Sequence, residues 1–490
     1  MRSLIEGGDI VAYAGGGHRL LRGGVLVFED DRVSFVGRSF PGAVDRRIDA
    51  SGKLVIPGLV NIHCHADVEA GGRLVADIGR RDYFHTGFLN YFAARKGVKA
   101  LGARQDPEIG GRFALAELLR NGCTTVVEIG VAAEQHARIA GELGLRAYLS
   151  PAYRSHDYCL TAEGQLYYDV DEEAGLAGLE RAKAFIRAHA GRYGGRIQGM
   201  LFPYQVDTCS PGLLRATRKA ADELGVGIEI HAGQNLLEFH EILRRHTMTP
   251  VEYLADTGLL APGAIVGHCI ISTAHHLAAL PGGRDLEILA RTGASVAHCP
   301  LVFARRGNAL ESFTKFRRAG VNVGLGTDTY PRDLISEMRW ASNLGKIVER
   351  DFTAATAAEV FTAATLGGAR ALSRDDLGRL APGAKADIVL IDMRSLRIGP
   401  YRDPIKALVQ CGTGDDVDQV IVDGETVVEG GRVVGVDEVT LLAEAQAEAE
   451  RLWRDVPEWH WQGLTADQLS PPSFPPLTAD LTSRAEETPP

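Results

Sequence analysis

Eight short runs of apolar residues recur through the middle of the chain, and the segments between them have the spacing of amphipathic helices. Several of those segments end in glycine, at Gly122, Gly225 and Gly320, as helices often do. The runs are too uniformly apolar to have a solvated face, which is typical of parallel strands covered by helices. This alternation predicts an α/β fold, a (β/α)8 TIM barrel, with strands inside the ranges 54–71, 123–130, 145–152, 196–203, 226–233, 264–271, 293–300 and 321–328.

The first run carries two histidines separated by one cysteine. Residues two apart in an extended strand point the same way, so Asn61, His63 and His65 are expected on one face and Cys64 on the other. This places two imidazoles on one side of the strand.

Polar residues mark the carboxyl-terminal ends of several other expected strands. A (β/α)8 barrel keeps its active site at that rim, so these side chains should share a single mouth. Several imidazoles with a carboxylate suit a divalent transition metal that keeps a position open for water. The residues at these strand ends are His63, His65, Glu128, His231, His268, His298 and Asp328.

The two ends of the chain have a different pattern, with short alternating strands and glycine-rich turns. Residues 1–56 and 378–435 are expected to form one small β-sandwich domain, which leaves 57–377 for the barrel. The final part, 436–490, holds an expected helix at 437–456 followed by a tail too rich in proline for regular structure.

Composition excludes several classes of partner. The 490 residues carry a net charge of −10 without a dense Lys/Arg run, which argues against nucleic acid and anionic membrane surfaces. We find no long uncharged apolar stretch and no signal-peptide pattern, and we expect a cytoplasmic protein. The seven cysteines are odd in number and lack CxxC pairs, so we expect them to be reduced.

An ordered set of motifs resembles the amidohydrolase superfamily, in its metal-dependent deaminase and chlorohydrolase branch. That branch includes cytosine, guanine and S-adenosylhomocysteine deaminases and the triazine hydrolases. The resemblance runs from about residue 20 to 435 and rests on the order of the pieces more than on any single one. The motifs are PGLVNIHCH (57–65), EIHAGQ (229–234), GHC (267–269), ASVAHCP (294–300), VGLGTD (323–328), ATLGGARAL (364–372) and GRLAPGAKADIVLID (378–392).

The resemblance implies a metal site. By position, His63, His65 and His231 would ligate the metal, and Asp328 would be both a ligand and the proton acceptor. His268 would hydrogen-bond the water or the oxygen that develops on the substrate.

The resemblance also implies the number of ions and the reaction. The fourth expected strand, RIQGMLFPYQ, has no lysine of the kind that two-metal relatives carbamylate, so we expect one divalent ion, zinc with iron as the alternative. A metal-bound hydroxide would then attack carbon and cleave a C–N bond of a small polar or heterocyclic substrate, by deamination or by amide- or urea-type hydrolysis.

The chain departs from these relatives at Gln234. Deaminases of this branch usually carry glutamate three residues after the histidine of the fifth strand, and glutamine cannot act as a general acid. Either Asp328 and His268 carry the whole proton path, or Glu128 or Glu238 substitutes. The change favours amide, urea, carbamate or lactam-like substrates, to whose carbonyl Gln234 can donate a hydrogen bond.

Loops without regular pattern are expected to set specificity. Segments 71–97 and 152–158 could cover the substrate, and an arginine there could receive a carboxylate. The candidate substrate contacts are Gln234, His298, Glu128, His85, Tyr153, Arg154, His156 and Arg332.

Several alternatives stay open. His298, Glu128 and Glu229 could be buried structural groups without a part in the chemistry. The same metal machinery would serve hydrolytic dechlorination of an s-triazine-like ring, and the fold also occurs in catalytically silent scaffolds. We further expect a homodimer or larger homo-oligomer.

Overall fold

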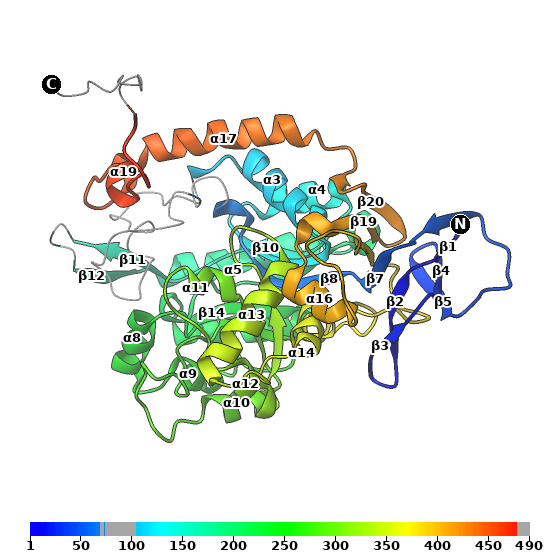
Figure 1. Ribbon diagram of the computed structural model, residues 1–490. Helices are drawn as coiled ribbons and strands as arrows, with labels where there is room; N and C mark the ends of the chain where they lie inside the picture. Colours follow the sequence, from blue (N-terminus) through cyan, green and yellow to red (C-terminus); the bar gives the residue numbers. More distant parts are fainter. Residues whose placement is uncertain (69–72, 74–103, 162, 164, 478–490) are drawn as a thin grey trace, which may run out of the picture.

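The computed structural model describes residues 1–68, 73, 104–161, 163 and 165–477, and its centre is a barrel of eight parallel strands (Figure 1). The ring closes where Cys64 pairs with Asp328 and the His65 backbone N–H donates to the Asp328 carbonyl at 2.7 Å. The predicted (β/α)8 barrel is confirmed. Its strands are β8 (Leu59–Cys64), β9 (Cys123–Gly130), β10 (Arg146–Pro151), β13 (Ile197–Leu201), β14 (Gly227–Ala232), β15 (Ala264–His268), β16 (Ser295–His298) and β17 (Asn322–Leu325).

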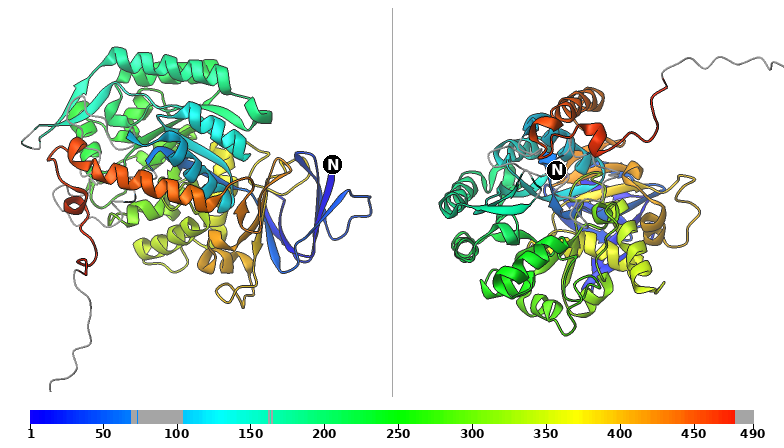
Figure 2. Two further views of the ribbon diagram at one scale, coloured as in Figure 1. Left: turned by 90° about the horizontal axis from the view of Figure 1, so that it is seen from above. Right: turned by 90° about the vertical axis from the view of Figure 1, so that its left-hand side faces the viewer.

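Helices surround this barrel (Figure 2). Gly225 caps the helix before β14 in a left-handed conformation, φ +65°, as its position in the sequence predicts. No helix in the described ranges is long and apolar enough to cross a membrane. The helices around the barrel are α3 (Pro107–Arg120), α4 (Ala133–Leu143), α5 (Glu172–His189), α6 (Arg192–Gly195), α7 (Pro211–Leu224), α8 (Leu236–His246), α9 (Pro250–Asp256), α10 (Asp285–Thr292), α11 (Pro300–Ala304), α12 (Phe313–Arg318), α13 (Leu334–Glu349), α14 (Ala357–Thr362) and α15 (Gly368–Ala371).

Strand β8 pairs irregularly with β9 in the stretch that contains His63. Its register against β9 shifts between Asn61 and Cys64, so strict alternation of side chains does not hold over those residues. Asn61 bridges the closure instead, because its amide donates to Thr327 Oγ1 at 2.8 Å and its oxygen accepts from the His63 backbone N–H at 3.2 Å.

Two smaller sheets lie at one end of the barrel (Figure 1). The seven-stranded sheet combines strands from both ends of the chain, and the four-stranded sheet is built from N-terminal strands. Apolar residues from both ends, including Phe28, Val55 and Ile388, form their shared core. The seven-stranded sheet has the order β21 (Arg432–Val433), β20 (Glu425–Glu429), β19 (Val417–Val422), β18 (Ile388–Asp392), β7 (Lys53–Pro57), β2 (Asp9–Ala14) and β3 (Gly17–Leu21). The four-stranded sheet has the order β5 (Arg32–Gly37), β4 (Val25–Glu29), β1 (Arg2–Glu6) and β6 (Arg46–Asp49).

Helix α17 (Glu438–Arg454) lies along α3, where Glu448 accepts a hydrogen bond from the Asp106 backbone N–H at 2.7 Å. The tail after it is more regular than its prolines predict. It contains α18 (Val456–Trp459) and α19 (Ala466–Leu469), and a capping box between Thr465 and Gln468 stabilises the second. The described part of the chain also contains the hairpin of β11 (His156–Leu160) with β12 (Leu166–Val170) and helix α16 (Pro404–Cys411).

Candidate metal centre

Three histidines meet at the carboxyl-terminal mouth of the barrel. His63 lies at the end of β8, His65 directly follows that strand, and His231 lies near the end of β14. One possible ligand atom of each lies within 4.8 Å of those of the other two, and all three side chains are buried. The structure thus brings together the three histidines for which the sequence predicts a common role.

Each of these rings has its Nδ1 fixed by a partner outside the cluster. A backbone carbonyl can only accept a hydrogen bond, so a ring nitrogen facing a carbonyl carries the proton and leaves the lone pair on Nε2. The three contacts are His63 Nδ1 to Glu229 Oε1 (2.5 Å), His65 Nδ1 to the Ile129 carbonyl (2.7 Å) and His231 Nδ1 to the Tyr204 carbonyl (2.5 Å).

The Nε2 atoms therefore face one another as acceptors. Those of His65 and His231 lie 3.0 Å apart, and that of His63 is buried without a hydrogen-bond partner in the described part of the chain. Burial lowers the pKa of His63 to about 4 and that of His231 well below its usual value, so both rings are neutral at pH 7. Three histidine ring nitrogens close together, two of them on rings that burial keeps neutral, are a donor set that fits a divalent metal ion.

Asp328 and His268 lie beside this cluster. His268 Nε2 is 3.4 Å from Asp328 Oδ2, and its ring centroid is 4.3 Å from that of His63. Asp328 has φ +58°, and its backbone N–H donates to the His63 carbonyl at 3.0 Å, which holds the backbone of Asp328 beside that of the first histidine. Burial, with neighbouring histidines, lowers the pKa of His268 well below its usual value, so this ring is also neutral.

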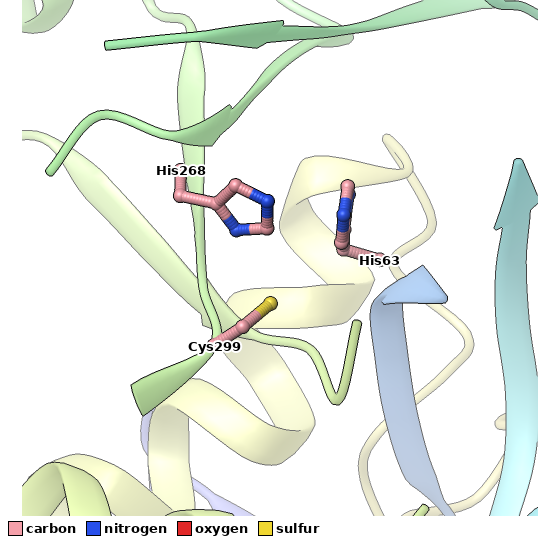
Figure 3. Close-up of side chains that lie close together, drawn as sticks. All are labelled: His63, His268 and Cys299. Atoms are coloured by element: carbon pink, nitrogen blue, oxygen red, sulfur yellow. The ribbon is translucent and has the colours of Figure 1, made fainter. Parts of the chain in front are cut away.

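A thiol borders the same group of rings. Cys299, directly after β16, offers its sulfur next to His63 and His268, and Figure 3 shows the three side chains converging. Gly326 makes this packing possible. A Cβ at that position would lie 2.7 Å from the His63 Cβ and 2.9 Å from the Cys299 Sγ, which is closer than side chains tolerate.

Gln234 and His298 are both buried near the mouth. The Gln234 backbone N–H donates to Glu238 Oε2 at 3.0 Å, and its own side-chain oxygen has no partner among the described residues. Burial lowers the pKa of His298 to about 3, and its ring lies against Phe313 with centroids 6.1 Å apart. The Glu238 carboxylate accepts hydrogen bonds from the Gly233 and Gln234 backbone N–H groups, which lie just before the start of α8.

Glu128 and Tyr153 have partners away from the histidine cluster. Glu128 pairs with His136 of α4, with Nδ1 and Oε1 3.2 Å apart, and accepts from the Ala66 backbone N–H. The Tyr153 hydroxyl lies 2.9 Å from Thr217 Oγ1 of α7. Both side chains are thereby tied to the helical layer.

The two candidate arginines are placed differently. Arg154 is exposed, pairs with Asp157, and stacks over the Tyr204 ring at 5.3 Å. The backbone carbonyl of Tyr204 accepts a hydrogen bond from His231, so Arg154 is connected to the histidine cluster through Tyr204. Arg332 is fully buried, donates to the His65 carbonyl at 2.5 Å and lies 3.5 Å from Glu117, so its charge already has a partner.

The last two candidate contacts are histidines. His156 begins β11 and its Nδ1 lies 2.8 Å from Ser155 Oγ. His85 lies outside the described residues.

Glu229 is the residue of this site whose part the sequence leaves open. It is fully buried, and its contact with His63 joins β14 to β8 behind the cluster. Glu229 lies two residues before His231, so both side chains are expected on the same face of the strand. This spacing is the feature of the sequence that could have identified Glu229 as part of the site. Burial raises the pKa of its carboxyl well above the usual value, so a nearby positive charge would be needed to keep it ionised.

Known proteins are similar to this chain along nearly its whole length. The profile of the amidohydrolase family matches residues 54–427. The chain is 32% identical over 455 residues to a 5'-deoxyadenosine deaminase of Methanothermobacter thermautotrophicus, covering 92% of this chain and 99% of the relative. It is 32% identical over 467 residues to a 5-methylthioadenosine/S-adenosylhomocysteine deaminase of Desulforudis audaxviator, covering 93% and 100%.

Two solved structures share the fold. An adenosine deaminase of Xanthomonas campestris with bound zinc has a TM-score of 0.76 and 24% identity, covering 92% of this chain and 98% of that one. An atrazine chlorohydrolase of Arthrobacter aurescens complexed with zinc has a TM-score of 0.73 and 21% identity, covering 91% and 100%.

Proposed function

The chain belongs to the amidohydrolase family, as a hydrolase that acts on carbon–nitrogen bonds, and we propose that one divalent ion held by four of its side chains drives the reaction. The four are His63, His65, His231 and Asp328. We propose zinc, which two structural relatives contain, with iron as the alternative.

The observation that carries this proposal is the 3.0 Å separation of the His65 and His231 Nε2 atoms. Each ring donates its Nδ1–H to a backbone carbonyl, so the neutral His231 ring has no proton left to donate to His65. Two lone pairs at this distance repel unless a cation lies between them.

Two protein side chains carry out the proton transfer and the hydrogen bonding of the reaction. A bound divalent ion lowers the pKa of a water molecule so that it can attack at neutral pH. Asp328 accepts the proton of the attacking water on its carboxylate. The neutral His268 ring, 3.4 Å from that carboxylate, would donate its N–H to the oxygen that develops on the substrate, and Asp328 would deliver the proton it accepted to the leaving nitrogen.

The comparisons favour one class of substrate. Relatives 32% identical along nearly the whole chain are named as deaminases of 5'-deoxyadenosine and of 5-methylthioadenosine and S-adenosylhomocysteine. Adenine nucleosides are therefore the first substrates to test, with release of ammonia.

Gln234 favours a second class. Glutamine donates a hydrogen bond but supplies no proton, and the nearby acids Glu128 and Glu238 are bound to His136 and to backbone N–H groups. An amide, urea or lactam carbonyl needs only a hydrogen-bond donor at that place. Asp328 and His268 then carry the proton path alone.

One experiment tests the proposal. The purified protein is analysed for metal and incubated with adenine nucleosides, aminotriazines, chlorotriazines, ureas and lactams, while ammonia, amine and chloride release are measured. We expect ammonia or amine release that a chelator abolishes and zinc restores. A metal-loaded protein without turnover of any of these would support a silent scaffold. Homo-oligomeric assembly and a cytoplasmic location remain predictions.

A further inference from the structure

The carboxylate of Glu229 lies behind the proposed metal centre rather than in it. Its Oε1 is 2.5 Å from His63 Nδ1, and both side chains are fully buried. Glu229 and His231 belong to the same strand, β14, so this contact joins the strand that supplies one expected ligand to the ring that supplies another.

The three histidines differ in what holds their outer nitrogen. His65 and His231 donate to neutral backbone carbonyls, whereas His63 faces a carboxylate. The proposed set of four ligands is complete without Glu229. The mechanism therefore leaves this buried acid unexplained.

Glu229 also lacks the compensation that a buried carboxylate needs. Among the described residues its ion pair is with His63, and its second oxygen, Oε2, has no hydrogen-bond partner. An isolated buried carboxylate is costly. A divalent ion on the far side of the His63 ring would supply the opposite charge.

We propose that Glu229 is a positioning residue for His63, which directs the His63 Nε2 toward the metal and, through its negative charge, strengthens that nitrogen as a ligand. This inference rests on the proposed metal ligation. A carboxylate on the outer nitrogen of a ligating histidine fixes the ring and raises its basicity, and loss of such a partner weakens metal binding about 10- to 100-fold.

The barrel offers a matched control in Glu128 on β9. Glu128 is equally buried and pairs through one oxygen with a histidine, His136, while its second oxygen has no hydrogen-bond partner among the residues that the structure describes. His136 lies on α4 outside the cluster. A general cost of removing a buried barrel carboxylate would affect both positions, whereas an effect on the metal would affect Glu229 alone.

The test compares wild type, E229Q and E128Q by zinc titration against a competing chelator and by the absorption spectrum of the cobalt-loaded proteins. We expect E229Q to bind zinc about 10- to 100-fold more weakly and to shift the cobalt spectrum. E128Q should keep the affinity and spectrum of wild type. E229D retains the charge on a shorter side chain and should bind zinc more weakly than wild type but more tightly than E229Q, so its comparison with wild type tests the proposal even if E229Q folds poorly.

The outcomes separate the two proposals. If wild type binds zinc and E229Q binds it equally well, or E128Q loses as much as E229Q, the role of Glu229 is overturned while the proposed function stands. If wild type binds no divalent ion, the proposed function fails and this inference fails with it.

Discussion

At the scale of single residues, hydrogen bonds to the outer nitrogens of the histidine rings determine which ring nitrogen is free to bind a metal ion. The carbonyls of Ile129 and Tyr204 fix the protons on Nδ1 of His65 and His231, and burial keeps the His231 ring neutral. The sequence predicts which histidines meet, because their strand ends are recognisable. It does not predict these carbonyl partners, because a backbone acceptor has no residue type to recognise.

Replacing His268 separates a proton-handling residue from a ligand. We expect His268→Asn to lower kcat about 100- to 1000-fold, because a donor toward the developing oxygen is lost. Zinc content should stay at the wild-type level, since the ligands are untouched. Steady-state kinetics and metal analysis of the same preparation check this, and loss of zinc together with activity would show that His268 is a ligand.

Replacing Gln234 tests whether this position acts as a hydrogen-bond donor or requires an acid. Gln234→Glu places a carboxylate where an amide can donate to the substrate, and we expect it to lower kcat/KM for the native substrate about 10-fold or more. The measurement is the rate of ammonia or amine release by both proteins on the best substrate found. A faster variant would mean that the position requires an acid.

At the scale of elements, the alternation of apolar runs predicts the eight barrel strands because parallel strands buried on both faces leave a strong pattern. The hairpin of β11 and β12 is not predicted, since its strands are only partly buried and their residues are mixed in polarity. Helices α18 and α19 are also not predicted, because four residues leave no periodic pattern; Pro457 lies in the first turn of α18, and a capping box at Thr465 starts α19.

A contact between elements ties the end sheets to the barrel and should make stability depend on pH. His18 Nε2 of β3 lies 2.9 Å from Thr365 Oγ1, and burial lowers the pKa of His18 to about 4. Between pH 6.5 and 4 the unfolded chain binds a proton that the folded chain does not, so stability falls as pH falls through this window.

The matching variant is His18→Gln, which can keep the hydrogen bond to Thr365 but does not titrate. We expect wild type to lose about 1–2 kcal/mol more stability than this variant between pH 7.5 and 5. Urea unfolding of both proteins at the two pH values measures the difference. Equal losses would show that His18 does not contribute to the acid sensitivity.

At the scale of the whole molecule, closure of the barrel is what assembles the site. The expected ligands come from β8, β14 and the segment after β17, which are far apart in sequence and meet only when the ring closes between Cys64 and Asp328. The end sheets lie at one end of that barrel, and α17 lies along its outside beside α3 (Figures 1 and 2). The sequence predicts this architecture through its ordered motifs, whereas substrate choice depends on loops that have no repeating pattern.

Metal content tests the central claim most directly. Zinc-loaded wild type, His231→Asn and the control His136→Gln, which replaces a buried histidine outside the cluster, are dialysed and analysed for bound metal. We predict one ion per chain in wild type and in His136→Gln, and a loss of most of it in His231→Asn. Wild type without metal, or His231→Asn with a full complement, would contradict the account.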